Sequence, residues 1–404
     1  MRLQKKFNMI NKKLVDTEVQ NFIEDYQNKK IDRLIFMKSP INGLKMSEIV
    51  EQIESKKKIK SKLPTWYNRK NIIYPNKIFL EQSSSEKTAL YKSKIVKGNT
   101  LIDLTGGFGV DSYFFSKKIE KIIHCEINNK LSNISKFNFN ILNATNIENI
   151  KIDGLDYIEN TSINFDWIYV DPSRRDCHNN KKILLKDCKP NIIEYVDTLI
   201  KRSKNILIKL SPMLDIKNTL KHLTNTKEVH IVSLKGEVKE LLFVLERNYK
   251  NDIMIKNINL DSGQKKYNFN YGDEKNKKNK LGKPLKYLYE PNSSVLKSGG
   301  FSSIGIDFRL EKLDDNTHLY TSHVIEKDFP GKIYFIDKII PFKKTLLNKL
   351  IKGQKINIKR RNFPKKIEEI KNEYKIKDGG DNYMFLTTNI SKPIILICSK
   401  IIMS

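Results

Sequence analysis

The sequence is poor in cysteine, tryptophan and histidine, with 4, 2 and 6 copies among 404 residues. The four cysteines, Cys125, Cys177, Cys188 and Cys398, form no Cys-x-x-Cys pair and do not alternate with histidine at metal-ligand spacing, which argues against a structural zinc site. The N-terminus lacks an apolar stretch of the signal-peptide type, and no window approaches the ~18 apolar residues of a membrane span. We therefore expect a cytoplasmic protein that holds no metal and contacts no membrane.

Acidic residues are outnumbered by basic ones, because Asp and Glu total 46 against 75 for Lys and Arg, a formal net charge of +29. An excess of this size predicts a polyanionic partner, most simply nucleic acid. The basic residues are nearly all lysine, and isoleucine and asparagine are abundant too, a bias that an AT-rich genome produces throughout a protein. Clustered arginines are therefore better evidence of a binding site than the net charge.

The chain is long enough for two or three domains, each with its own core. Residues 1–95 carry apolar side chains at helical spacing and are expected to be mostly helical. Within them, the lysine-rich run 56–62 is expected to be a solvated stretch or a loop. Residues 250–285 are rich in Lys and Asn, and we expect a loop or linker there.

Strand and helix patterns alternate between residues 100 and 246. We expect strands at 100–104, 121–126, 149–152, 165–170, 204–210, 228–234 and 238–246, and helices at 110–118, 128–142, 155–160, 190–203 and 213–223. Such alternation predicts a parallel sheet covered by helices on both faces. The last two strands are separated by Lys235-Gly236-Glu237 alone, so they must form a hairpin in which the final strand runs antiparallel. Seven strands with this ending are the architecture of class I methyltransferases, and they differ from the parallel six-stranded sheet that binds NAD.

The most informative segment is residues 100–111, Thr-Leu-Ile-Asp-Leu-Thr-Gly-Gly-Phe-Gly-Val-Asp. It predicts a strand that ends in Asp103, a turn through Gly106, Gly107 and Gly109, and the start of a helix. Ligands bind at this edge of an open α/β sheet, and glycine lets a backbone approach them closely. An acid at the strand end would repel the pyrophosphate of a dinucleotide and attract the ammonium of a methionine-like group. The segment therefore favours S-adenosylmethionine over NAD.

Other side chains near the strand ends extend this predicted cofactor site. Glu126 ends the second strand, where a carboxylate can accept both hydroxyls of a ribose; the alternative is a solvated acid. Asp153 follows the third strand and can accept the exocyclic amine of adenine; the alternative is a helix cap. Gln82 and Ser84 precede the first strand and either cover the cofactor or cap a helix.

The fourth strand is followed by Asp171-Pro172-Ser173-Arg174-Arg175-Asp176. The proline stiffens this loop, and the carboxylate or backbone carbonyl of Asp171 can hold a nucleophilic amine near a methyl donor. The adjacent arginines can meet a phosphate or stack on a base; the alternative is a loop in which Asp176 pairs with an arginine. The residues after the fifth strand are expected near the same pocket, or else they end a strand and begin a helix: Lys209, Ser211 and Asp215.

As a set, Asp103–Asp111, Glu126, Asp153 and Asp171-Pro172-Ser173-Arg174 resemble the motifs of class I S-adenosylmethionine-dependent methyltransferases. The C-terminal region resembles the bacterial members that carry a THUMP-like domain, through Tyr289–Ser294, Arg361-Asn362-Phe363-Pro364 and Asp378-Gly379-Gly380-Asp381. The resemblance implies a cofactor site formed by Asp103, Thr105, Gly106, Gly107, Gly109, Glu126 and Asp153. It also implies an RNA substrate, since THUMP domains serve RNA-modifying enzymes.

The expected architecture is α/β, a seven-stranded Rossmann-like methyltransferase sheet between an N-terminal helical region and a C-terminal α+β THUMP-like domain. We expect the boundaries as follows: a mostly helical region at 1–95, the methyltransferase domain at 96–250, a linker with a small ferredoxin-like α+β segment at 251–330, and the THUMP-like domain at 331–404.

The loop after the fourth strand departs from that of enzymes that methylate amino groups. Those carry Asp or Asn, then Pro-Pro and an aromatic residue that stacks on the flipped base, whereas here Ser173 replaces the second proline and Arg174 the aromatic. Asp-Pro-x-Arg is closer to the pyrimidine C5 methyltransferases, which use a cysteine to attack the ring. Cys177 is the candidate for that role, and an ordinary loop cysteine is the alternative. The methylated atom is left open.

Arg360 and Arg361 stand beside Phe363 and several lysines, a combination that suits a phosphate backbone with one stacked base; the alternative is a solvated charged face. We therefore predict a methyltransferase that acts on a base in tRNA or rRNA. Its catalytic loop would be Asp171, Pro172, Ser173 and Arg174, and its RNA contacts Arg175, Arg360, Arg361 and Phe363. The alternatives are a methyltransferase for a protein or small molecule, and a non-catalytic RNA-binding protein with a methyltransferase-like fold.

Overall fold

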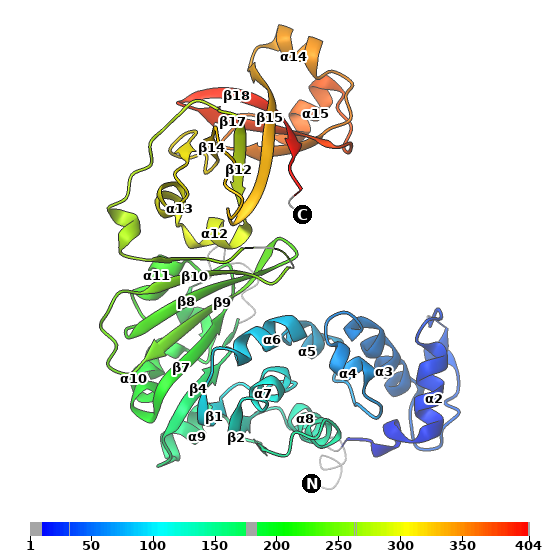
Figure 1. Cartoon of the computed structure of the whole chain (residues 1–404). Coiled ribbons are helices and arrows are strands. Elements are labelled where there is room, and N and C mark those ends of the chain that lie inside the picture. Colours follow the sequence, from blue (N-terminus) through cyan, green and yellow to red (C-terminus); the bar gives the residue numbers. More distant parts are fainter. Residues whose placement is uncertain (1–9, 32, 175–183, 262, 264, 403–404) are drawn as a thin grey trace. The chain divides into compact units, whose positions relative to one another are not determined.

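The computed structural model describes residues 10–31, 33–174, 184–261, 263 and 265–402. The chain divides into two compact units, Met1–Thr226 with Phe243–Tyr249 and Lys227–Leu242 with Lys250–Ser404, which we describe in turn (Figure 1). Within the described residues, none of the helices combines the length and the apolar character that crossing a bilayer requires.

The first unit begins with short helices, as the apolar spacing predicted: α2 (Thr17–Tyr26), α3 (Met46–Ile59), α4 (Pro64–Asn68), α5 (Lys77–Gln82) and α6 (Glu86–Ser93). Helix α3 continues through much of the lysine run in which we expected a solvated stretch or loop. The reason is that Ile53 and Ile59 bury one face of this helix, and the stem of Lys56 is buried with them.

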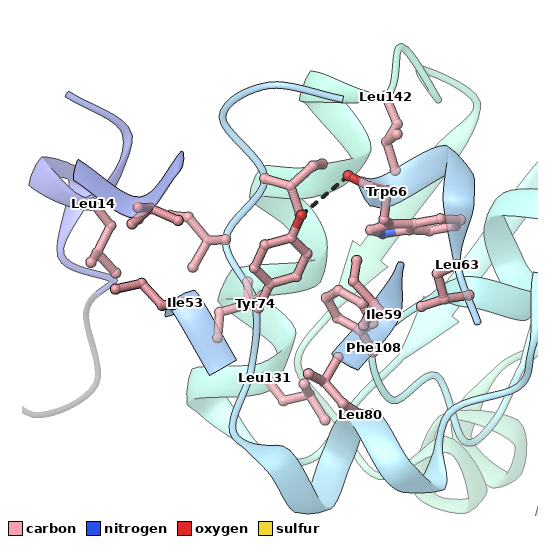
Figure 2. Close-up of a cluster of buried hydrophobic side chains, with 14 of the residues drawn as sticks. Leu14, Ile53, Ile59, Leu63, Trp66, Tyr74, Leu80, Phe108, Leu131 and Leu142 are labelled. Atoms are coloured by element: carbon pink, nitrogen blue, oxygen red, sulfur yellow. Dashed lines mark hydrogen bonds between the residues drawn. The ribbon is translucent and has the colours of Figure 1, made fainter. Parts of the chain in front are cut away.

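The N-terminal helices share a hydrophobic core with the helices that follow β1 and β2. Figure 2 shows Ile53, Trp66 and Tyr74 from the N-terminal region in one cluster with Phe108 and Leu131. The Tyr74 hydroxyl donates a hydrogen bond of 3.2 Å to the carbonyl of Trp66, so this buried hydroxyl is paired within the cluster. Helices shorter than about 12 residues are marginal in isolation, and this shared core is what stabilises them.

The first unit then forms the expected parallel sheet. Strands β1 (Gly98–Asp103), β2 (Ile119–Cys125), β3 (Ile147–Ile150), β4 (Phe165–Val170) and β7 (Ser203–Leu210) pair in the order β7-β4-β1-β2-β3. Between them run α7 (Val110–Phe115), α8 (Asn129–Ile141), α9 (Gly154–Asn160), α10 (Ile192–Arg202) and, after β7, α11 (Ile216–Leu220). Helices α6, α7 and α8 cover one face of the sheet, and α9 and α10 cover the other (Figure 1). The carboxyl ends of the strands therefore share one edge, as the sequence predicted.

The complete sheet has the order β11-β10-β8-β9-β7-β4-β1-β2-β3. The hairpin of β8 (Thr226–Leu234) and β9 (Glu237–Glu246) supplies the last two of the seven expected strands. The expectation of a loop or linker after residue 250 was wrong, because β10 (Met254–Asn259) pairs with β8 and β11 (Tyr267–Asn270) pairs with β10. Their buried side chains, Ile255, Ile258, Tyr267 and Phe269, are separated by Lys and Asn, which dilutes the apolar pattern.

The rest of the second unit is built on another sheet, of order β13-β14-β12-β15-β18-β17-β16. Its strands are β12 (Tyr287–Pro291), β13 (Glu311–Lys312), β14 (Tyr320–Ser322), β15 (Gly331–Pro341), β16 (Asn357–Arg361), β17 (Asn382–Asn389) and β18 (Lys392–Lys400). Helices α12 (Ser293–Ser298), α13 (Phe301–Asp307), α14 (Lys344–Leu350) and α15 (Ile367–Tyr374) connect them. Strands β12 and β15 pair directly, so the sheet is continuous from residue 287 to residue 400.

Candidate functional site

The turn after β1 is organised around the carboxylate of Asp103, which is 1% exposed. Its Oδ1 accepts a hydrogen bond from the Thr105 amide (3.0 Å), and its Oδ2 accepts one from the Ser112 hydroxyl (2.6 Å). Burial raises the pKa of Asp103 to about 7, although both hydrogen bonds act in the opposite direction. Asp103 therefore acts inside the turn and shapes it, rather than presenting its charge to solvent.

A buried histidine continues this hydrogen-bond chain. The Nδ1 of His124 on β2 lies 2.9 Å from the Ser112 hydroxyl oxygen. When Asp103 is ionised, the single proton of that hydroxyl goes to its carboxylate, so Nδ1 of the imidazole carries a proton. Burial lowers the pKa of His124 to about 3, so the ring is neutral. Sequence reasoning missed both Ser112 and His124, because neither stands in a recognisable motif.

The three glycines of the turn have different roles. A Cβ on Gly106 would lie 2.2 Å from the His124 ring, and a Cβ on Gly109 would lie 2.4 Å from the ring of Phe139. These two glycines let the turn pack against the protein itself. At Gly107, with φ +59°, the nearest atom to an added Cβ is the Thr105 carbonyl oxygen at 3.8 Å. The backbone at Gly107 is therefore the part of the turn with room for a ligand.

Glu126, just beyond β2, lies beside this open position. Its Oε2 accepts a hydrogen bond from the Gly107 amide (2.8 Å) and its Oε1 accepts one from the Asn128 amide (2.6 Å). Burial raises the pKa of this carboxyl, and the two backbone hydrogen bonds oppose the rise. Each oxygen keeps a further lone pair, so the carboxylate can accept two hydroxyl groups while it holds the turn in place.

Asp153 lies at the same edge of the sheet, and its side chain caps α9 by accepting a hydrogen bond from the Leu155 amide at 2.8 Å. This is the alternative that the sequence left open. A Cβ on Gly154 would lie 2.3 Å from the Leu104 carbonyl oxygen, so the loop after β3 contacts the end of β1 closely.

The loop after β4 is tied to the turn after β1. The Asp171 amide donates a hydrogen bond of 2.7 Å to the Thr105 hydroxyl, and the Asp171 carboxylate pairs with Lys209 at the end of β7. Pro172 is buried. Ser173 and Arg174 form the short strand β5 (Ser173–Arg174), which pairs with β6 (Cys188–Lys189). Arg175, Asp176 and Cys177 lie outside the described residues.

Four buried polar groups form a network behind this edge that the sequence did not indicate. The side chain of Lys92 on α6 is 0% exposed and lies 3.2 Å from Oδ1 of Asp111 on α7. Asp111 Oδ2 accepts hydrogen bonds from the hydroxyls of Ser84 (2.7 Å) and Tyr169 (2.8 Å). Burial raises the pKa of Asp111, but Lys92, Lys209 and these hydroxyls outweigh it and hold the pKa below its usual value. The network joins α6 and α7 to β4.

Two more predicted residues have structural contacts of their own. Asp215 caps α11 by accepting a hydrogen bond from the Asn218 amide at 2.6 Å, and the Ser211 hydroxyl accepts one from the Met213 amide at 3.3 Å. Gln82 ends α5 and is exposed. Of the residues expected around the pocket from outside the main motifs, Lys209 is the one that contacts the Asp171 loop directly.

The arginine pair of the C-terminal region is engaged within the second unit. Arg360 donates two hydrogen bonds to the Phe363 carbonyl, with Nε at 3.0 Å. Arg361 Nη2 lies 3.1 Å from Glu290, which is 6% exposed and also pairs with Lys359. Phe363 is 3% exposed and packs edge-on against Phe342. The prediction that Phe363 stacks on a base was therefore wrong, because its ring belongs to the core.

The described cysteines offer no reactive thiol. Cys125, Cys188 and Cys398 are buried and unpaired with one another, and burial raises the pKa of the Cys125 and Cys398 thiols far above the usual range. Among the residues that the structure describes, three or more His, Cys, Asp or Glu side chains nowhere gather as metal ligands would.

Comparison with known proteins assigns both parts of the second sheet. Residues 287–330 match a ferredoxin-like domain, and residues 331–400 match a THUMP domain-like family. No curated protein matches the chain.

Solved structures extend the comparison over the whole chain. A candidate methyltransferase from Porphyromonas gingivalis W83 is 30% identical, covers 97% of this chain over 99% of its own, and superposes with a TM-score of 0.88. M. capricolum TrmK, solved with S-adenosylhomocysteine, is 17% identical and covers 40% of this chain over 69% of its own, with a TM-score of 0.32. SMU.1697c of Streptococcus mutans, also solved with S-adenosylhomocysteine, is 15% identical and covers 40% over 96%, with a TM-score of 0.31.

The last two likenesses are too slight to bear on activity or ligand, whereas the first spans both chains almost end to end. Together with the strand order, the glycine turn and the THUMP-like match, it shows that the chain belongs to the bacterial class I methyltransferase family that carries a C-terminal THUMP-like domain.

Proposed function

We propose that the protein is an S-adenosylmethionine-dependent methyltransferase that modifies a base in RNA. The observation that carries the proposal is the open backbone at Gly107, with the Glu126 carboxylate on one side and the Asp171 loop tied to the same turn through Thr105. A nucleoside-containing cofactor fits this arrangement, since its ribose hydroxyls would meet Glu126 and its methionine end the turn that Asp103 shapes. We propose Asp153 for the adenine, although its side chain also caps α9.

Bound there, S-adenosylmethionine would supply a methyl group from its sulfonium, with the sulfur retaining the electron pair of the broken bond. The protein's part is to align the acceptor and exclude water. The salt bridge with Lys209 fixes the Asp171 side chain, and Pro172 restricts the loop, so an acceptor atom can be held in one place. Both an amine nitrogen and a pyrimidine carbon remain candidate acceptors.

Three features support RNA as the substrate. The net charge is +29, the second unit carries the THUMP domain-like match, and Ser173 and Arg174 follow Asp171 and Pro172 at the point where a target base would enter. The first alternative, a protein or small-molecule substrate, predicts methylation that survives ribonuclease. The second, a non-catalytic RNA-binding protein, predicts no affinity for the cofactor.

The first test is calorimetric titration of the purified protein with S-adenosylmethionine and, separately, with NAD. We expect micromolar binding of S-adenosylmethionine and none of NAD, and we expect Asp103→Ala to abolish binding because the turn loses the carboxylate that anchors it. Retained micromolar binding by Asp103→Ala would count against the proposed site. Transfer of a tritiated methyl group to RNA from a strain that lacks the gene then tests the substrate class.

A further inference from the structure

A strongly basic segment lies within the N-terminal helical region, at residues 55–80. It contains neither Asp nor Glu, and its cations are Lys56, Lys57, Lys58, Lys60, Lys62, Arg69, Lys70 and Lys77. Apart from Lys56 and Lys62, these side chains are exposed. The packing of α3 and α4 depends on Ile53, Ile59 and Trp66 and does not require a row of exposed cations. Two of the cations are paired with carboxylates outside the segment, Lys56 with Glu24 and Lys58 with Glu81. The excess of positive charge that the other cations leave is the electrostatic sign of a nucleic-acid contact.

An open polar groove with a volume of about 490 Å³ is lined in part by this segment. One wall is the loop after α4 and the other is the C-terminal end of α8, and the lining residues are Asn68, Arg69, Lys70, Asn71, Asn140, Ile141 and Asn143. These seven residues include no carboxylate. Asparagine amides both donate and accept hydrogen bonds, as the edges of nucleic-acid bases do, and the two cations suit a phosphate.

The walls of the groove are held together by hydrogen bonds, so its shape exists before a ligand binds. Arg69 Nε donates a bond of 2.9 Å to the Ile141 carbonyl across the groove. One turn earlier on α8, the side chain of Asn138 accepts a hydrogen bond from the backbone amide of Ile73 (3.0 Å) and donates one to the backbone carbonyl of the same residue (2.8 Å). Recognition by a preformed site avoids much of the ordering cost of binding.

The groove lies at the far end of the helix that starts next to the predicted ribose site. Helix α8 begins three residues after Glu126 and has 13 residues, so its two ends are ~20 Å apart at 1.5 Å per residue. A stacked strand covers that length in about six nucleotides at 3.4 Å each.

One lysine of the basic segment lies close enough to Lys209, the partner of Asp171, to be repelled by it. The ammonium of Lys62 donates to the Leu80 and Glu81 carbonyls. Burial, followed by repulsion from Lys209, lowers the pKa of Lys62 to about 8, and Lys209 is the residue that pairs with Asp171. The basic segment therefore includes a cation near the predicted methylation site as well as the two that line the groove.

We propose that the groove binds a nucleotide of the RNA substrate several positions from the methylated base, with Arg69 and Lys70 on phosphate and the asparagines on a base edge. The N-terminal helices then hold the substrate in addition to packing against the sheet. This inference rests on the proposed function for the identity of the RNA-modifying site, but the binding itself is measured separately.

The test compares Lys70→Glu with Lys201→Glu, which makes the same charge change at an exposed position in the last turn of α10, on the face of the sheet opposite α8. The probe is fluorescein-labelled total tRNA, followed by anisotropy over a range of salt concentrations. We expect Lys70→Glu to weaken binding at least fivefold and to reduce the salt slope by about one, and Lys201→Glu to stay within twofold of the wild type. Equal losses in the two variants would overturn the proposal.

A second readout locates the RNA. A 20-nucleotide oligoribonucleotide containing 4-thiouridine is crosslinked to the full chain, and the modified peptides are identified by mass spectrometry. Crosslinks within residues 68–71 or 140–143 support the groove, and crosslinks confined to other peptides refute it. If the wild type fails to bind S-adenosylmethionine in calorimetry, the proposed function fails, while the anisotropy and crosslinking results still decide the groove.

Discussion

Replacing Lys92 by methionine should destabilise the first unit strongly. The Lys92 side chain is 0% exposed and its partner Asp111 is nearly as buried, and removing one member of a buried ion pair costs about 3–5 kcal/mol because the other charge is left uncompensated. Asp111 keeps its hydrogen bonds from Ser84 and Tyr169, so we expect the lower end of that range, about 3 kcal/mol. In a unit of this size, that corresponds to a fall in Tm of about 6–12 °C.

The assay is urea unfolding followed by tryptophan fluorescence. The chain has 2 tryptophans, Trp66 and Trp167, and both are buried in the first unit, so the signal reports on that unit. The matched control is Lys94→Met, an exposed lysine just after the same helix, which should change the free energy of unfolding by less than about 0.5 kcal/mol. Adding Asp111→Asn to Lys92→Met should restore about 2 kcal/mol, because no buried charge is then left unpaired. Equal small losses of unfolding free energy in Lys92→Met and Lys94→Met would show that the Lys92–Asp111 pair does not stabilise the unit.

Three further variants test other parts of the molecule. The pKa of Asp103 is raised to about 7 in the fold, above its unfolded value of about 3.9, so the stability that this carboxyl contributes is lost as pH rises through 7. Between pH 6 and pH 8, the unfolding free energy of Asp103→Asn should therefore rise by about 1.4 kcal/mol relative to that of the wild type. A constant difference across that window would contradict the raised pKa. Gly106→Ala places a methyl group 2.2 Å from the His124 ring and should lower the free energy of unfolding by about 1–3 kcal/mol. The loss should be at least 1 kcal/mol smaller when His124 is also replaced by alanine, and additive losses in this double-mutant cycle would exclude the contact. Glu290→Gln leaves Lys359 and Arg361 facing a neutral group that is 6% exposed. The stability of the second unit, measured by circular dichroism, should fall by about 3 kcal/mol, while the unfolding transition seen by tryptophan fluorescence does not move.

The sheet of the first unit was predictable because its strands are buried on both faces. A parallel strand covered by helices gives a short continuous apolar run, and residues 165–170 show it clearly, so the predicted and observed bounds agree. The link at Lys235 and Gly236 is too short for a crossover between parallel strands, so the sequence predicted a hairpin, and β8 and β9 form one. Strands β10 and β11 escaped prediction because lysine and asparagine interrupt their apolar positions.

Much of the candidate site was visible as motifs, but not as contacts. The residue types at Asp103, Glu126 and Asp171 indicated which strand ends matter, since the carboxyl edge of a parallel sheet gathers them. The pattern could not separate Gly107, where an added Cβ would meet only the Thr105 carbonyl oxygen at 3.8 Å, from Gly106 and Gly109, which face aromatic rings. A buried lysine such as Lys92 is also invisible in sequence, because a lysine in a helix is normally exposed.

The extra strands of the first sheet have a consequence for how the protein behaves at high concentration. A long unpaired sheet edge can recruit a strand from another molecule and start aggregation. The sheet ends at β3 on one side and β11 on the other, and each of these strands has 4 residues. Strand β11 covers β10, which in turn covers the longer edge of β8, and two lysines, Lys265 and Lys266, stand just before it. A segment that resembles a linker in sequence therefore closes the sheet against self-association.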